Sequence, residues 1–117
     1  MVRSITVVGA LLGASLALAL PAGAASQATG VTVTAGTPSE FHFTLSKKSV
    51  AKGAVTFVVT NKGKLTHDFR IGGKKTALLK PGKKATLTVV LKAGKAPYLC
   101  TLPGHAAGGM KGTLTVK

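Results

Sequence analysis

The stretch that decides the fold is YLCTLPGHAAGGMKG, residues 98–112, which leads into a short alternating pattern at the C-terminus. Cys100, His105 and Met110 recur in it at five-residue intervals, among small residues, glycine and proline. A thiolate, an imidazole and a thioether are soft donors, and with a second imidazole they form a set that copper takes in electron-transfer sites. The stretch therefore predicts three of the four ligands of a metal site.

The fourth ligand must come from elsewhere, and strand parity chooses between the two remaining histidines. In residues 66–71, His67 shares a face with Phe69, so we expect it to point inward. In residues 40–45, His42 alternates with two phenylalanines, so we expect it to point outward. His67 is therefore the predicted ligand and His42 a surface residue.

Each of these side chains, taken singly, has a structural alternative. A lone buried cysteine is often a small hydrophobe, Met110 could fill the core, and His105 could be a loop residue. Cys100 is, however, the one cysteine of the chain, so it cannot form an internal disulfide and needs another explanation. Met110 is the only methionine after Met1, and it lies as far from His105 as Cys100 does. The combination favours a metal site.

From Val31 onward the hydrophobic residues recur with period two, which is typical of half-buried strands. Turn residues such as Gly, Pro and Asn separate the alternating segments, and no segment has a helical period of useful length. The pattern predicts an all-β, antiparallel sandwich or barrel of seven or eight short strands. The clearest alternating segments are 31–34, 40–45, 55–60, 66–71, 86–92 and 114–116.

Two motifs stand out, Tyr98-x-Cys100-x-x-Pro103-Gly104-His105-x-x-x-x-Met110-x-Gly112 and the upstream Asn61-x-Gly63…His67-x-Phe69. In these motifs the sequence resembles the cupredoxins, the type 1 blue copper proteins that include plastocyanin and azurin. The resemblance covers residues 31–117, and four-residue gaps on both sides of the central histidine are more similar to auracyanin and rusticyanin than to plastocyanin. It implies a Greek-key β-sandwich, one mononuclear type 1 copper and one-electron transfer. It also implies three equatorial ligands, His67, Cys100 and His105, with Met110 as the axial one.

One position departs from the family pattern. The residue after the first histidine is commonly Asn in cupredoxins, where its side chain helps to tie the two ligand loops together; here it is Asp68. A carboxylate can still accept a hydrogen bond from Thr101, the residue after the cysteine. Because it also brings negative charge, we predict that Asp68 favours Cu(II) over Cu(I) and lowers the reduction potential.

Residues 1–25 have the pattern of a cleavable signal peptide. Arg3 is followed by an apolar run over residues 5–20 and then by small residues at a cleavage point. A membrane anchor is the alternative, but the run is short for a span of about 20 residues. We expect an exported protein, periplasmic or extracellular, with a short tail over residues 26–30 and one copper-binding domain over residues 31–117.

The charge balance is extreme, with 16 Lys and Arg against 2 Asp and Glu, a net charge of +14. Such a field attracts polyanions, so we expect transient contact with an acidic redox partner protein, and an anionic membrane or cell-wall surface also fits. A lysine coat that merely keeps the protein soluble is the plainer explanation of much of this charge. Nucleic acid is not expected, because the few aromatic residues fit a core and no nucleic-acid motif is present. We expect a monomer.

The predicted function is that of a one-electron carrier. Two alternatives stay open: a protein that stores or delivers copper outside the cytoplasm, and a metal-free secreted sandwich that binds anionic surfaces. An enzyme is not expected. Multicopper oxidases need further histidine clusters, and Glu40 and Asp68, as the only side-chain carboxylates, provide no paired acid and base.

Overall fold

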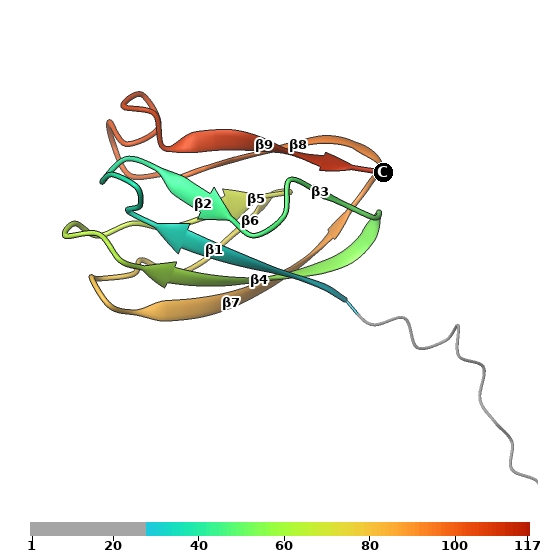
Figure 1. The fold of residues 1–117 in the computed structure, drawn as a ribbon, viewed down its shortest axis with the longest axis horizontal. Coiled ribbons are helices and arrows are strands. Elements are labelled where there is room, and N and C mark those ends of the chain that lie inside the picture. The colour runs from blue at the N-terminus through green and yellow to red at the C-terminus, as the bar shows by residue number, and fades with distance from the viewer. Residues whose placement is uncertain (1–27) are drawn as a thin grey trace, which may run out of the picture.

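The computed structural model describes residues 28–117, so the predicted signal peptide and the start of the predicted tail lie outside the described residues. Within this range the chain forms β-strands and no helix (Figure 1). No helix able to cross a membrane is present in the described part of the chain. The strands are β1 (Thr29–Ala35), β2 (Phe43–Leu45), β3 (Ser49–Val50), β4 (Gly53–Asn61), β5 (Arg70–Ile71), β6 (Lys74–Lys75), β7 (Lys84–Leu91), β8 (Gly94–Leu99) and β9 (Lys111–Val116).

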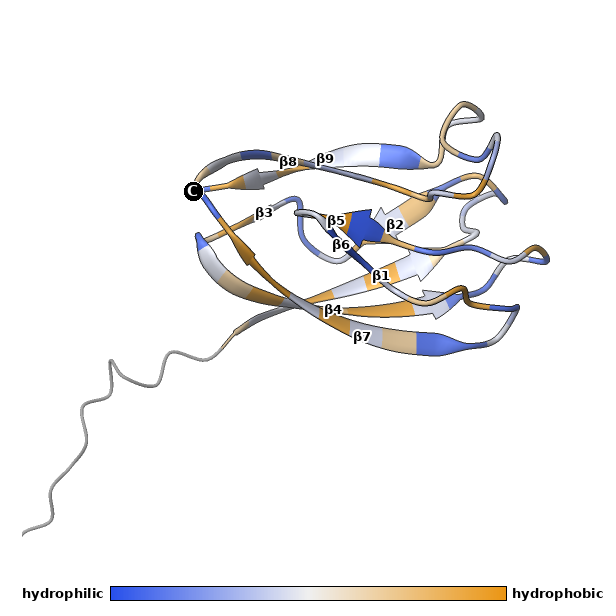
Figure 2. Cartoon of the chain, turned by 180° about the vertical axis from the view of Figure 1, so that it is seen from behind, coloured by the Kyte–Doolittle hydropathy of each residue, from blue (hydrophilic) through white to orange (hydrophobic). Residues whose placement is uncertain are grey.

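The strands form two sheets that lie face to face (Figure 1), one in the order β2-β1-β4-β7 and the other in the order β3-β9-β8-β5-β6. The period-two pattern explains why. In β4, Val55, Phe57 and Val59 are buried while the residues between them are partly exposed, as a sheet with one wet face requires. Along β4 and β7 hydrophobic residues are interspersed with polar ones (Figure 2). The predicted all-β sandwich is confirmed.

Two strand pairs differ from the antiparallel arrangement that the sequence analysis predicted. β1 runs parallel to β4, with Val31 beside Phe57, and β3 runs parallel to β9. The period-two pattern shows which face of a strand is buried but not the direction of its neighbour, so this part of the prediction was wrong. The described residues also form nine strands instead of seven or eight, because two-residue strands such as β3 and β6 are too short for a pattern to reveal.

Several predicted strands are shorter or longer than expected. Residues 36–42 form turns, so only Phe43–Leu45 of the predicted strand 40–45 is extended in a sheet. In the segment 66–71 only Arg70–Ile71 belongs to a strand, while His67 makes an isolated bridge to Leu79. At the start, β1 begins at Thr29 and so includes residues assigned to the tail. The unpaired segments before β2 and β5 supply the loops discussed next.

The core between the sheets is aromatic and aliphatic. Phe43 packs edge-on against Phe69 and Tyr98, with ring centroids 5.2 and 5.9 Å apart, and Phe57 lies 5.3 Å from Phe69. A second, smaller buried cluster contains Ala35, Cys100 and Met110, with Phe41, Phe43 and Leu102 packed against it. This cluster lies under the loops that join the two sheets, so a packed core supports the segment that carries the predicted ligands.

Candidate metal centre

Three predicted ligands converge from two loops. His67 lies in the loop between β4 and β5, Cys100 follows β8, and His105 lies in the loop between β8 and β9. His67 Nδ1 is 3.2 Å from His105 Nδ1, and Cys100 Sγ is 3.4 Å from the same nitrogen. One donor atom from each of the three side chains lies within 4.8 Å of the others. The fold therefore brings together side chains that are up to 38 residues apart in the sequence.

The spacing of these donors fits one ion. Donors bound to a common metal at about 2.0–2.3 Å lie roughly 3.3–3.6 Å apart in a tetrahedral arrangement. The separations of 3.2 and 3.4 Å are close to this range. Two imidazoles with a thiolate form the soft trigonal set of blue-copper sites. The residues present thus fit a single copper ion by both donor chemistry and spacing.

Met110, the fourth predicted ligand, is fully buried in the small cluster with Ala35 and Cys100. Its backbone closes the ligand loop, because Cys100 N–H donates to Met110 C=O at 3.1 Å and Met110 N–H donates to His105 C=O at 3.0 Å. Met110 is therefore held to both neighbouring ligands by main-chain hydrogen bonds, with its thioether inside the protein.

The loop that carries His105 is folded by its own backbone. His105 N–H donates to Leu102 C=O at 3.1 Å, and Gly108 N–H donates to Gly104 C=O at 3.0 Å. Gly104 has φ of 82°, in the left-handed region that favours glycine. These turns present the partly exposed His105 ring beside Phe41, with ring centroids 5.0 Å apart.

Asp68 ties the two ligand loops together. It is buried, and its Oδ1 accepts from Thr101 N–H at 2.6 Å while its Oδ2 accepts from the Thr101 hydroxyl at 2.5 Å. Its own N–H points at Cys100 Sγ, 3.5 Å away. The hydrogen bond predicted between Asp68 and Thr101 is thus present, and the carboxylate is turned toward the cysteine loop and away from solvent.

Burial sets the proton chemistry of the metal-free site. It raises the pKa of the Cys100 thiol, and the Asp68 N–H opposes this shift in part. It lowers the pKa of His105, with the nearby His67 acting in the same direction. His105 is therefore held in the neutral form that binds metals, whereas Cys100 keeps its proton until a metal displaces it.

His67 is held on its outer side by Glu40, to which the sequence analysis assigned no role at the metal site. Glu40 Oε2 lies 2.6 Å from His67 Nε2 and also accepts from Leu65 N–H at 3.1 Å. The Lys64 N–H, hydrogen-bonded to both carboxylate oxygens, is the main cause that lowers the pKa of Glu40. The alternation through 40–45 missed this contact because residues 36–42 form turns, in which strand parity does not apply.

The side chain of Asn61 holds the His67 loop in place through hydrogen bonds to its backbone. Its buried side-chain amide donates to Leu65 C=O at 2.8 Å and to Leu79 C=O at 2.7 Å, and its Oδ1 accepts from Gly63 N–H at 2.8 Å. His67 N–H donates to the same Leu79 carbonyl at 3.1 Å. One satisfied amide thus fixes both the loop and the strand segment that His67 pairs with.

The other histidine is excluded from the cluster. His42 is exposed, and its Nδ1 lies 2.5 Å from the Ser39 hydroxyl. Although residues 36–42 are not a strand, His42 points away from the core as predicted, and His67 points into it.

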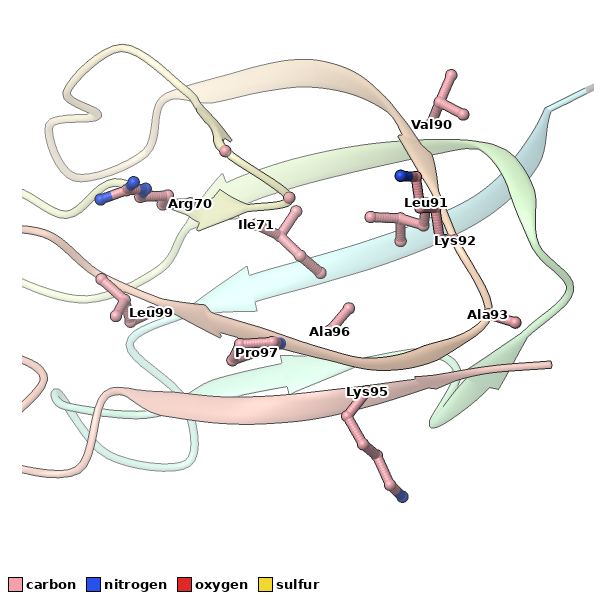
Figure 3. Close-up of a pocket in the computed structure, with 12 residues that line it drawn as sticks. Arg70, Ile71, Val90, Leu91, Lys92, Ala93, Lys95, Ala96, Pro97 and Leu99 are labelled. Atoms are coloured by element: carbon pink, nitrogen blue, oxygen red, sulfur yellow. The ribbon is translucent and has the colours of Figure 1, made fainter.

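A groove of about 560 Å³ lies on the side of the sandwich, between β7 and β8. Ile71, Leu91 and Ala96 point toward one another across it, while Lys95 extends away (Figure 3). None of the four predicted ligands lines this groove. The metal-ligand cluster is therefore a separate feature, at the loop end of the sandwich.

Comparison with known proteins gives related sequences and folds. Auracyanin-B of Chloroflexus aurantiacus is 50% identical over 42 residues, which are 35% of this chain and 18% of that protein. The copper-resistant cuproprotein CopI of Pseudomonas aeruginosa is 26% identical over 97% of this chain and 94% of its own length.

Solved structures agree with the fold. Auracyanin B superposes with a TM-score of 0.69 at 24% identity, covering 80% of this chain and 91% of the other. Rusticyanin of Thiobacillus ferrooxidans gives a TM-score of 0.61 at 28% identity, covering 80% of this chain and 79% of the other. The two sheets and their connections are therefore those of a cupredoxin.

The family model of copper-binding proteins, plastocyanin/azurin family, matches residues 28–117, which is all of the chain that the structure describes. This match includes the loops that carry both histidines, the cysteine and the methionine. The chain belongs to the plastocyanin/azurin family of copper-binding proteins, the cupredoxins.

Proposed function

We propose that this chain is a small exported type 1 copper protein that carries single electrons. His67 and His105 would hold the ion through Nδ1, Cys100 through its thiolate, and Met110 through its thioether as the weak axial ligand. The observation that carries the proposal is the convergence of one donor atom each from His67, Cys100 and His105 within 4.8 Å, with His105 Nδ1 3.2 Å from His67 Nδ1 and 3.4 Å from Cys100 Sγ. When bound, copper supplies one-electron exchange between Cu(II) and Cu(I).

The chain's own part in this function is to keep the donors still. The hydrogen bonds from Thr101 to Asp68 join the loop of His67 to the loop of Cys100. Asn61 fixes the first loop to Leu79, and the main-chain bonds of Met110 close the second. A scaffold that resists rearrangement suits fast electron transfer, because little has to move when the charge of the ion changes.

The proposed exit for the electron is the edge of His105. Residues 102–109 carry no charged side chain, and Leu65, in the adjacent His67 loop, is 45% exposed. Phe41 packs against the His105 ring. An apolar rim around a partly exposed ligand suits the small, short-lived contacts of redox pairs.

Copper storage or delivery is the second candidate. It is favoured by the match to a protein named as a copper-resistant cuproprotein, which spans nearly the full length of both chains. Reversible redox cycling with retention of both copper states would support electron carriage. Rapid loss of Cu(I) to a chelating acceptor would support delivery.

The visible spectrum of residues 26–117 with Cu(II) tests the site. We expect an intense thiolate-to-copper band that is absent from Cys100→Ser and from His67→Ala. His42→Ala is the matched control, because this exposed histidine lies outside the cluster and its loss should leave the band unchanged. A wild-type protein that binds no copper, or a band that survives Cys100→Ser, would overturn the proposal.

A further inference from the structure

Glu40 sits at the outer edge of the His67 ring. Its side chain is 25% exposed, whereas the His67 side chain is fully buried. Because Nδ1 of His67 faces His105 and Nε2 faces Glu40 at 2.6 Å, the two ring nitrogens have different partners. If Nε2 carries the ring proton and donates a hydrogen bond to the carboxylate, the lone pair lies on Nδ1, the nitrogen that faces the other donors.

The loop next to His67 has room for this carboxylate only because residue 63 has no side chain. A Cβ on Gly63 would lie 2.2 Å from Glu40 Oε2 and 3.1 Å from His67 Nε2. The loop also turns two donors toward the same group, the N–H groups of Lys64 and Leu65. The carboxylate therefore occupies a seat formed by Gly63 and the backbone of the following residues.

The contacts of Glu40 are unusual for an acidic residue in so basic a chain. Only 2 of its side chains are acidic against 16 basic ones, and none of the lysines or Arg70 forms an ion pair with Glu40 in the described residues. If Glu40 served only solubility or surface pairing, we would expect it to form an ion pair with one of the many lysines. Glu40 instead contacts a predicted ligand and two main-chain N–H groups.

Building on the proposed copper site, we propose that Glu40 is a positioning residue for His67 that also weights the site toward Cu(II). It holds His67 as the Nε2–H tautomer with Nδ1 free for the metal. Its negative charge, passed through the ring, stabilises the more highly charged Cu(II) relative to Cu(I). Nothing in the spacing of the ligands themselves indicates this role.

The first test uses the metal-free protein. Ring ¹⁵N chemical shifts of His67, measured at pH 8, report which nitrogen carries the proton. We expect Nε2–H in the wild type and in Glu40→Gln, whose amide oxygen can still accept from Nε2. In Glu40→Ala, and in Gly63→Ala, where the seat is filled, we expect a mixture of tautomers. A wild-type ring protonated on Nδ1, or a tautomer unaffected by Glu40→Ala, would overturn the positioning role.

The second test separates charge from geometry. Glu40→Gln keeps an acceptor for His67 Nε2 but removes the negative charge, and it should bind Cu(II) about 10–100-fold more weakly, the range typical of substitutions behind a metal ligand. Its Cu(I) affinity should change less. For each factor of ten by which the loss of Cu(II) affinity exceeds the loss of Cu(I) affinity, the reduction potential rises by about 59 mV. A charge-matched control is Ala51→Lys, which adds one positive charge in the exposed turn beside the C-terminal residue, at the far end of the sandwich (Figure 1).

The outcomes are distinguishable. Equal loss of Cu(I) and Cu(II) affinity in Glu40→Gln, or an equal change in potential from Ala51→Lys, would contradict the charge effect. A loss of unfolding free energy alone, with tautomer and potential unchanged, would show that Glu40 only braces the loop. If the wild type bound no copper, the proposed function would fail, yet the tautomer measurement would still decide whether Glu40 orients His67.

Discussion

At the scale of single residues, the negative charge of the described chain is concentrated at the metal centre. Its two acidic side chains, Glu40 and Asp68, contact the two loops that hold the predicted ligands. Asp68 is buried and takes both of its hydrogen bonds from Thr101, so its charge is shielded by fewer water molecules than a surface carboxylate. A charge in such surroundings acts more strongly on a nearby ion than the same charge in water.

Asp68→Asn is therefore expected to raise the reduction potential. The amide oxygen can replace Oδ1 as the acceptor for Thr101 N–H, so the loops stay tied while the charge is removed. We expect the ratio of Cu(II) to Cu(I) affinity to fall by about tenfold or more, or about 59 mV for each factor of ten. Protein voltammetry measures the change directly.

A variant that keeps the charge provides the comparison. Thr101→Val removes the hydroxyl that donates to Asp68 Oδ2 but leaves the N–H bond and the carboxylate in place. Its shift in potential should be smaller than that of Asp68→Asn. An unchanged potential in Asp68→Asn would mean that this carboxylate does not lower the potential of the site.

At the scale of strands and loops, the sequence predicted the cluster where strand parity or loop spacing applied. The even spacing of Cys100, His105 and Met110 predicted three of the side chains that gather. The inward direction of His67 was also predicted, although only Arg70–Ile71 of its segment lies in a strand, because His67 still pairs with Leu79 in an isolated bridge. Glu40 was not predictable in this way, because parity was extended through residues that form turns. The parallel pairing of β1 with β4 was also missed, since strand direction depends on crossings between the sheets that no local pattern encodes.

One of these loop contacts is set by two glycines. Gly36, after β1, has φ of 87°, and a Cβ there would lie 2.5 Å from the backbone N and Cα of Gly63. Gly82 has φ of 86° but an added Cβ would meet nothing within 4 Å. Comparing alanine substitutions at Gly36 and Gly82 therefore separates two contributions to the free energy of unfolding, that of a left-handed backbone and that of a steric clash.

Gly82→Ala is expected to lower the free energy of unfolding by about 1–2 kcal/mol, from the left-handed conformation alone. Gly36→Ala should cost about 1–3 kcal/mol more, because backbone atoms have to move to admit the methyl group. Urea unfolding of the metal-free protein measures both values. Because the clash displaces the loop that seats Glu40 and His67, Gly36→Ala should also weaken Cu(II) binding while Gly82→Ala should not. Equal effects of the two substitutions would show that the Gly36 and Gly63 loops can move apart without loss of unfolding free energy.

At the scale of the whole molecule, positive charge surrounds a neutral tip. Hydrophilic segments lie at the start of β7, at the start of β9 and around β5–β6 (Figure 2), whereas the His105 loop, residues 102–109, has no charged side chain. With residues 1–25 removed, 15 basic and 2 acidic side chains remain, a net charge of +13. Such a field attracts an acidic protein from a distance, and the apolar tip leaves the final contact free of charge pairs that would have to be desolvated.

This arrangement predicts that electron transfer with an acidic haem protein slows as salt is added. The screening length falls from about 30 Å at 0.01 M to about 8 Å at 0.15 M ionic strength, so attraction by distant lysines is lost first. Stopped-flow rates should fall steeply over this range, while rates with an uncharged small oxidant stay nearly constant.

Two double variants locate the docking face. Lys62→Gln with Lys64→Gln, in the His67 loop, should reduce the salt dependence of the rate more than Lys52→Gln with Lys117→Gln, which lie together at the opposite end. A flat salt response in the wild type would assign the lysines to solubility alone, and equal effects of the two double variants would mean that the docking face is not the His105 end of the sandwich.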